Sequence, residues 1–190
     1  MNFKESDHIQ MLRDTLRKFI KNEMPKHLVS KWDQEDYFPK DVFKKLVDLG
    51  VTSLTVPEEY GGSGVDMVAA IATIEELSSR SIGMASAFIQ CSCYAGLNIL
   101  ESGSMEQKNE LLPRVANGEL LFSYGISEPD VGGDVASVLT IAKLDNDEVI
   151  INGSKRWCSG VLIANYIFTL VRSGPADERY RNLSIVLVPP

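Results

Sequence analysis

The sequence predicts an α+β protein in which an N-terminal all-α helical bundle precedes an incomplete antiparallel β middle domain. Up to about residue 119, apolar residues recur every three or four positions, as on one face of a helix. From residue 120 onward, short apolar runs are separated by turn-forming residues, as in strands. We therefore expect two domains, residues 1–119 and 120–190. The 44% hydrophobic and 24% charged residues of this 190-residue chain suffice for a packed core.

The helical part contains a series of apolar stripes. The first stripe predicts a helix that ends before Pro25 and is formed by Ile9, Leu12, Leu16, Phe19 and Ile20. Further stripes occupy residues 42–49 and 67–77, while residues 82–100 are apolar in nearly every direction, as in the buried central helix of a bundle. The spacing of Ser104 and Gln107 predicts a capping box at the start of the last helix.

The β part is expected to be antiparallel throughout. The predicted strands are Leu120–Ile126, Ala136–Leu144, 148–151, Arg156–Ser159, Tyr166–Val171 and Leu183–Val188. Residues 145–147 predict a turn, and Asn152-Gly153 is the dipeptide most typical of a tight hairpin. The final strand would leave a sheet edge unpaired. Either earlier strands close it in an unusual order, or the chain is part of a longer polypeptide, and we favour the second explanation.

Composition disfavours several functions. The net charge of −7 lacks the basic field that a nucleic acid requires, so we expect no nucleic-acid partner. No apolar run approaches the ~18–20 residues of a membrane span, so we expect none. The cysteines, Cys91, Cys93 and Cys158, are odd in number and lack CxxC spacing, which favours reduced thiols and a cytoplasmic location. Two histidines supply neither a metal site nor a Ser-His-Asp triad well.

Two segments of the β part are candidates for ligand binding. Residues 124–134 join a strand end to Pro129 and the Gly132-Gly133 pair, whose free N–H groups suit an anionic oxygen or a ring carbonyl. A plain tight loop has the same composition. Trp157 and Ser159, on one face of a strand, could line a planar cofactor, although Trp157 could equally belong to the core.

In order and spacing, these segments resemble those of the acyl-CoA dehydrogenase family of flavoproteins. The resemblance extends along the chain, and its two most specific motifs are Ser127-Glu128-Pro129-Asp130-Val131-Gly132-Gly133-Asp134 and Asn152-Gly153-Ser154-Lys155-Arg156-Trp157-Cys158-Ser159. Earlier matches are Pro57-Glu58-Glu59-Tyr60-Gly61-Gly62, Glu106-Gln107-Lys108, Leu112-Pro113 and Gly118-Glu119. The resemblance implies a helical domain, a flavin-binding β middle domain and, in the full family pattern, a C-terminal four-helix domain.

The resemblance also implies an FAD site. Tyr124, Ile126 and Ser127 would face the flavin. Gly132 and Gly133 would approach the cofactor pyrophosphate, and Gly133 also the substrate's phosphates. Trp157 and Ser159 would cover the isoalloxazine, with Cys158 between them at the cofactor site. The family usually has serine at the position of Gly133, so one hydroxyl contact is missing here.

The implied reaction is the α,β-dehydrogenation of an acyl-CoA thioester in fatty acid metabolism. The implied partners are an electron-transfer flavoprotein, as acceptor, and further copies of the chain in a homo-oligomer. We name no catalytic residue, because the family's glutamate base lies beyond the middle domain, and we expect Glu128 to be structural. The alternatives are a non-catalytic subunit completed by a partner chain, or a flavin oxidase or monooxygenase of the same architecture.

Overall fold

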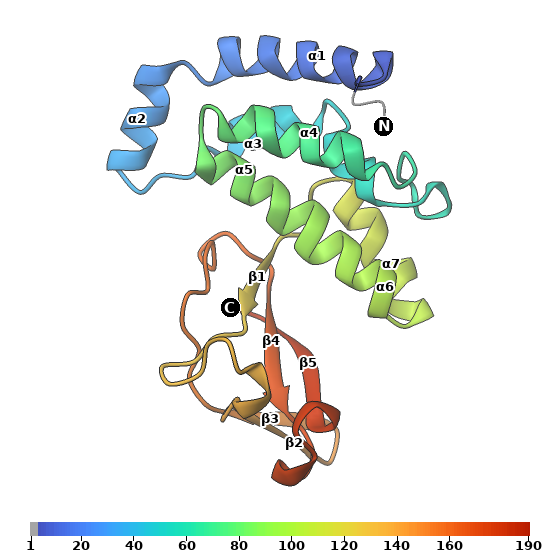
Figure 1. Ribbon diagram of the computed structural model, residues 1–190, viewed down its shortest axis with the longest axis vertical. Helices are drawn as coiled ribbons and strands as arrows, with labels where there is room; N and C mark the ends of the chain where they lie inside the picture. Colours follow the sequence, from blue (N-terminus) through green and yellow to red (C-terminus); the bar gives the residue numbers. More distant parts are fainter. Residues whose placement is uncertain (1–3) are drawn as a thin grey trace. The chain divides into compact units, whose positions relative to one another are not determined.

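The computed structural model describes residues 4–190, which divide into two compact units (Figure 1). The first unit ends at Leu121 and is helical, and the second, Phe122–Pro190, contains the sheet. The described residues form seven α-helices and five strands, with 3-10 and π-helical segments between them. This order of elements confirms the predicted α+β class.

The first helices follow the apolar stripes, with one addition. Helix α1 (Asp7–Glu23) buries Ile9, Leu16, Phe19 and Ile20, as predicted. Ile9 packs against Ala69 and Ala72 of α4 (Met67–Ser78). Helix α3 (Lys40–Val47) follows the second predicted stripe. Helix α2 (Lys26–Gln34) was not predicted, and none of its residues is buried: Leu28 is exposed, and Val29 and Trp32 are half-buried.

The apolar segment after α4 is a helix that changes its hydrogen-bonding pattern midway. Helix α5 (Ile82–Phe88) continues as a π-helical stretch, Ile89–Leu97, and then as α6 (Asn98–Ser102). Contrary to the sequence expectation, the run Ile82–Ser102 is long and apolar enough to cross a membrane by length and composition. Its most apolar window is 56% buried within the protein, and the core helix of a soluble protein passes the same test.

The last helix has the predicted start and end. In α7 (Met105–Ala116), the Gln107 N–H donates to Ser104 Oγ at 3.2 Å and the Ser104 N–H donates to Gln107 Oε1 at 2.9 Å. Gly118 then adopts a left-handed backbone conformation, with φ of +66°, and a Cβ there would collide with Val47. Glycine is therefore required at this helix end.

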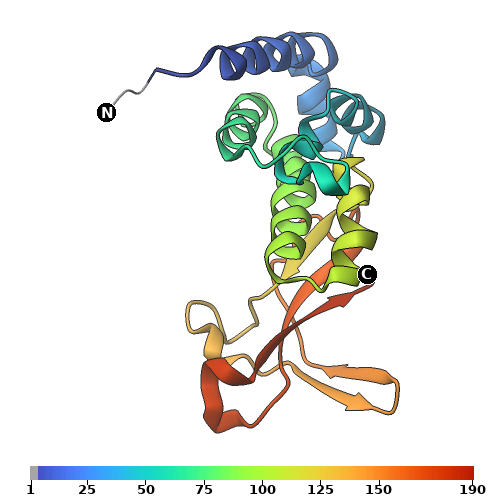
Figure 2. The same cartoon turned by 90° about the vertical axis from the view of Figure 1, so that its right-hand side faces the viewer.

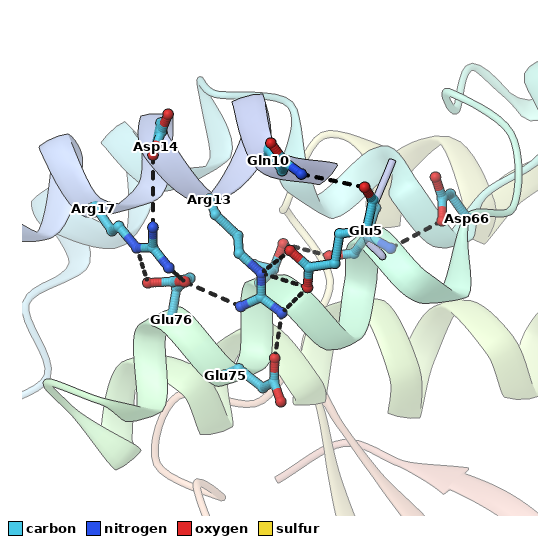
Figure 3. A network of polar contacts seen from close by, with 10 residues as sticks. Glu5, Gln10, Arg13, Asp14, Arg17, Asp66, Glu75 and Glu76 are labelled. Carbon is cyan, nitrogen blue, oxygen red and sulfur yellow. Dashed lines mark hydrogen bonds and ion pairs between the residues drawn. The ribbon is translucent and has the colours of Figure 1, made fainter. Parts of the chain in front are cut away.

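A network of ion pairs joins α1 to α4 (Figure 3). The Arg13 guanidinium donates to Glu5 at 2.7 Å, to Glu75 at 2.5 Å and to Glu76 at 3.0 Å. Arg17 donates to the same Glu76 carboxylate at 2.8 Å. Burial raises the pKa of Glu76, but the two arginines outweigh it and the net shift is downward. The network thus adds charged contacts to the apolar packing between the two helices.

The sheet of the second unit is mixed. Strand β4 (Tyr166–Arg172) lies at its centre and pairs in parallel with β1 (Phe122–Gly125) and antiparallel with β5 (Leu183–Val188). The hairpin of β2 (Ile141–Asp145) and β3 (Glu148–Asn152) meets β4 at a single parallel pair. The expectation of a wholly antiparallel sheet was therefore wrong for β1–β4 and β2–β4.

The hairpin turn lies earlier than its strongest sequence candidate (Figure 2). Strands β2 and β3 are joined at Asn146 and Asp147, where Asn146 has a φ of +54°, in agreement with the predicted turn at 145–147. The prediction of a hairpin at Asn152-Gly153 was wrong. The backbone leaves β3 at Asn152 and forms no strand until β4.

Candidate functional site

The first candidate segment begins on strand β1. Tyr124 lies on β1 directly opposite Phe168 of β4, and the two rings stack with centroids 5.2 Å apart. Ile126 and Ser127 follow immediately after the strand ends at Gly125, and both are half-buried. The position of this segment is therefore set by the pairing of β1 with β4.

The two motifs predicted to bind the cofactor lie side by side. The Arg156 N–H donates to the carbonyl oxygen of Ser127 at 2.8 Å. The Lys155 ammonium donates to the carbonyl oxygen of Ile126 at 3.1 Å and to Glu128 Oε1 at 2.8 Å. The Ser123 hydroxyl donates to the Ser159 carbonyl at 3.0 Å. These bonds hold the segment after β1 against the segment after β3.

Glu128 is buried, and hydrogen-bond donors surround its carboxylate. Its carboxylate accepts the Lys155 ammonium and the backbone N–H groups of Leu139 and Thr140, at 2.7 and 2.9 Å. Burial raises the pKa of Glu128, but Lys155 and the hydrogen-bond donors outweigh it and lower the pKa to about 2. A carboxylate that is ionised and occupied in this way is poorly suited to accept a proton from a substrate.

Trp157 is neither in the core nor on a strand. It is 78% exposed, and its backbone is left-handed with φ of +63°. The Ser159 N–H donates to the Trp157 carbonyl oxygen at 2.8 Å, so the chain turns sharply here. The prediction that Trp157 and Ser159 share one face of a strand was therefore wrong. Ser159 is exposed and Cys158 is half-buried in this turn.

Gly132 and Gly133 lie just beyond a small closed turn. Within it, the Glu128 N–H donates to the Val131 carbonyl at 2.9 Å, and the Val131 N–H donates back to Glu128 at 3.3 Å. Both glycines are exposed, and a Cβ at either would meet no atom within 4 Å. A serine would therefore fit at position 133. Hydrogen bonds among residues 4–190 do not link either glycine to the Trp157 segment.

The residues present fit a flat cofactor with a phosphate tail. A left-handed backbone at a bulky residue costs roughly 1–2 kcal/mol, and strain of this kind is concentrated at functional sites. At Trp157 this conformation accompanies an indole ring that is largely exposed, although large aromatic rings are ordinarily well buried. Gly132 and Gly133 offer backbone that a ligand can approach without meeting a side chain.

Sequence reasoning overlooked Lys155. Its ammonium lies between the two motifs, and its side chain is only 10% exposed. A lysine beside a predicted hairpin turn is normally read as a solvated surface residue, because lysine is almost never buried unless it is paired. Glu128 is a suitable partner for a buried lysine, but the sequence does not show that the two segments are in contact.

The comparisons with known proteins agree with this arrangement. Residues 6–119 match the model for the acyl-CoA dehydrogenase N-terminal domain, and residues 123–190 match that for the middle domain. A probable acyl-CoA dehydrogenase of Bacillus subtilis is 31% identical over the whole chain, which spans 50% of that relative. The crystal structure of an acyl-CoA dehydrogenase from Geobacillus kaustophilus superposes with a TM-score of 0.90 at 26% identity, covering 100% of this chain and 50% of that one.

A third similarity is to a structure of the electron transferring flavoprotein of Acidaminococcus fermentans. It has a TM-score of 0.90 at 25% identity, with 100% of this chain and 50% of that chain covered. The chain spans half or less of the length of the first curated relatives that it matches. Because the two domain models follow one another in the same order as the helical unit and the sheet unit, the chain belongs to the acyl-CoA dehydrogenase family of oxidoreductases.

Proposed function

We propose that this chain is the flavin-binding part of an FAD-dependent acyl-CoA dehydrogenase. The observation that carries the proposal is the lateral contact of the two motifs, in which Arg156 donates to Ser127 and places the Trp157 turn beside the end of β1. In this reaction a proton leaves the carbon α to the thioester and a hydride leaves the β carbon, giving an α,β-unsaturated acyl-CoA. FAD, when bound, supplies the acceptor for the hydride.

The chain's own residues would bind and orient the cofactor. Tyr124 on β1 and Ile126 and Ser127 directly after it would face the isoalloxazine, and Trp157 would cover the ring together with Cys158 and Ser159. Gly132 and Gly133 would approach the pyrophosphate, and Gly133 also the CoA phosphates. We assign the proton-accepting role to none of these residues. Glu128 is unsuitable because three donors occupy its carboxylate.

We also propose an electron-transfer flavoprotein as electron acceptor, a homo-oligomeric assembly and a cytoplasmic location. The similarity in fold to the Acidaminococcus fermentans structure supports the electron acceptor. Family membership supports the homo-oligomeric assembly. The three free cysteines support the cytoplasmic location. Mixing the reduced protein with an electron-transfer flavoprotein under anaerobic conditions tests the acceptor, while native mass spectrometry tests the assembly.

The decisive experiment is flavin reduction. The protein is purified from its whole coding region, loaded with FAD and mixed anaerobically with straight and branched acyl-CoA thioesters. We expect at least one thioester to bleach the visible absorption of the flavin. Failure to bind FAD would refute the cofactor assignment, whereas bound FAD that no acyl-CoA reduces would refute the dehydrogenase assignment. Rapid reoxidation by oxygen would favour the oxidase alternative.

A further inference from the structure

Lys155 connects the chain segment after β3 to the segment after β1, and neither segment belongs to a strand. Its ammonium bonds to the Ile126 carbonyl on one side of Ser127 and to the Glu128 carboxylate on the other. The Lys155 ammonium therefore contacts the residues on both sides of Ser127. Two residues after Lys155, the chain turns at Trp157.

Glu128 extends this connection to the start of β2. Its carboxylate accepts the N–H groups of Leu139 and Thr140, directly before that strand. Gly153, which follows β3, lies so close to Thr140 that a Cβ there would collide with it. Segments around residues 127, 140 and 155 thus converge on one buried ion pair, in which the Glu128 side chain is only 4% exposed.

The backbone hydrogen bond from Arg156 to Ser127 couples the position of the segment after β3 to that of the segment after β1. A displacement of Lys155 would move Arg156, and with it both Ser127 and the start of the Trp157 turn. The side chain of Lys155 is engaged with Ile126 and Glu128, so its role in this arrangement is to place other residues.

We propose that Glu128 and Lys155 form a positioning pair that sets the spacing between the two cofactor-facing segments, Ile126–Ser127 and Trp157–Ser159. This inference rests on the proposed FAD site. Neither residue touches the flavin in this assignment. Their effect on the cofactor is transmitted through the backbone of Ser127 and Arg156.

The test separates the geometry of the segments from FAD binding. In a Trp32→Phe background, Trp157 is the remaining tryptophan, and 5-fluorotryptophan at this position gives a single ¹⁹F resonance in the protein without cofactor. We expect Lys155→Met to shift or broaden that resonance. In the same proteins, FAD titration should show binding weakened about tenfold or more, as when a residue that orients the groups contacting a ligand is removed.

Graded variants and a matched control make the outcome decisive. Glu128→Gln retains an acceptor for the backbone N–H groups, and Lys155→Arg retains the charge, so both should give smaller changes of the same kind. If Lys155→Met does not fold, these two variants decide the question. Arg13→Met removes a comparable ion-pair donor from the helical unit and should leave both the Trp157 resonance and FAD affinity unchanged.

The possible failures are distinguishable. Folded Lys155→Met and Glu128→Gln proteins with an unchanged Trp157 resonance would overturn the positioning pair, whatever their FAD affinity. A shifted resonance in a protein whose parent binds no FAD would refute the proposed cofactor while supporting the pair as the element that spaces the two segments.

Discussion

The two units of this protein each contain an ion-pair cluster, and the clusters differ in what surrounds them. In the helical unit, Arg13 is shared by three carboxylates that it reaches from α1, and its side chain is 16% exposed. The apolar side chain of Ile9 also packs between α1 and α4. In the sheet unit, the Lys155–Glu128 pair is more deeply buried and joins segments outside regular secondary structure.

This difference shows that similar chemistry serves two purposes. Helices α1 and α4 would remain in contact through their apolar faces without Arg13, so that network adds stability to an arrangement that packing already determines. The segments around Ser127 and Lys155 have no such shared helical face. For them we expect the ion pair and its backbone donors to contribute to the geometry itself, together with the pairing of β1 with β4.

The largest effect is expected for Glu128→Ala. The substitution leaves the Lys155 ammonium and two N–H groups buried without their acceptor, and breaking a buried pair in this way costs about 3–5 kcal/mol. Urea denaturation followed by Trp157 fluorescence measures the loss. Arg179→Met, which removes the exposed pair with Asp134 in the same unit, should cost less than about 1 kcal/mol. If both substitutions lower the free energy of unfolding equally, burial does not decide how much these ion pairs contribute to stability.

Acid should weaken the sheet unit through the same carboxylate. The pKa of Glu128 is lowered from 4.5 to about 2 in the folded protein, so its contribution is complete above pH 4.5 and is lost as the pH falls toward 2. The expected loss between neutral pH and pH 3 is on the order of 2 kcal/mol. Urea midpoints measured across this range should fall less in Glu128→Gln. A parallel decline in both proteins would show that other carboxylates, such as Glu76, dominate.

Arg13→Met should have a smaller effect, about 1–2 kcal/mol, because the charged hydrogen bonds that it removes are partly exposed. Thermal unfolding of the helical unit measures it. Arg17→Met is the matched control and should cost less, since the more exposed Arg17 pairs only with Glu76 and with the exposed Asp14. High salt should reduce the Arg13 effect, and insensitivity to salt would argue that lost packing is the cause.

The smallest effect is expected at the start of α7. Ser104→Ala removes the acceptor for the Gln107 N–H and should cost about 1 kcal/mol. Circular dichroism during thermal unfolding measures the change. Ser104→Asp, which restores an acceptor at the same position, should recover most of the loss. If both variants are equally unstable, the side-chain cap is not what stabilises this end of the helix.

Features governed by neighbours in the chain could be predicted from the sequence. The capping box at Ser104, the buried stripe of α1 and the end of α7 at Gly118 each depend on residues a few positions apart. Helix α2 was not predicted because its apolar residues, Leu28, Val29 and Trp32, span little more than one helical turn. The π-helical stretch Ile89–Leu97 lies where apolar residues face every direction, so periodicity could not reveal the change of pitch.

Features governed by distant neighbours could not be predicted in this way. Asn152-Gly153 and Asn146-Asp147 both favour turns; the hairpin forms at Asn146-Asp147, and the chain after β3 instead places Lys155 against Glu128. The exposed, left-handed Trp157 lies two residues beyond that contact. The two candidate motifs were recognisable in the sequence, but the residue pair that holds them together was not.

The parallel pairing of β1 with β4 has a consequence for how this unit is made. Phe122 is fully buried and its partner in the sheet is Tyr166, so β1 has no place to dock until that distant stretch of chain has been synthesised. Closing so long a loop is entropically costly, and non-local pairings of this kind are formed slowly. Both candidate motifs lie inside the closed loop. We therefore expect both motifs to reach their final positions only after this pairing has formed.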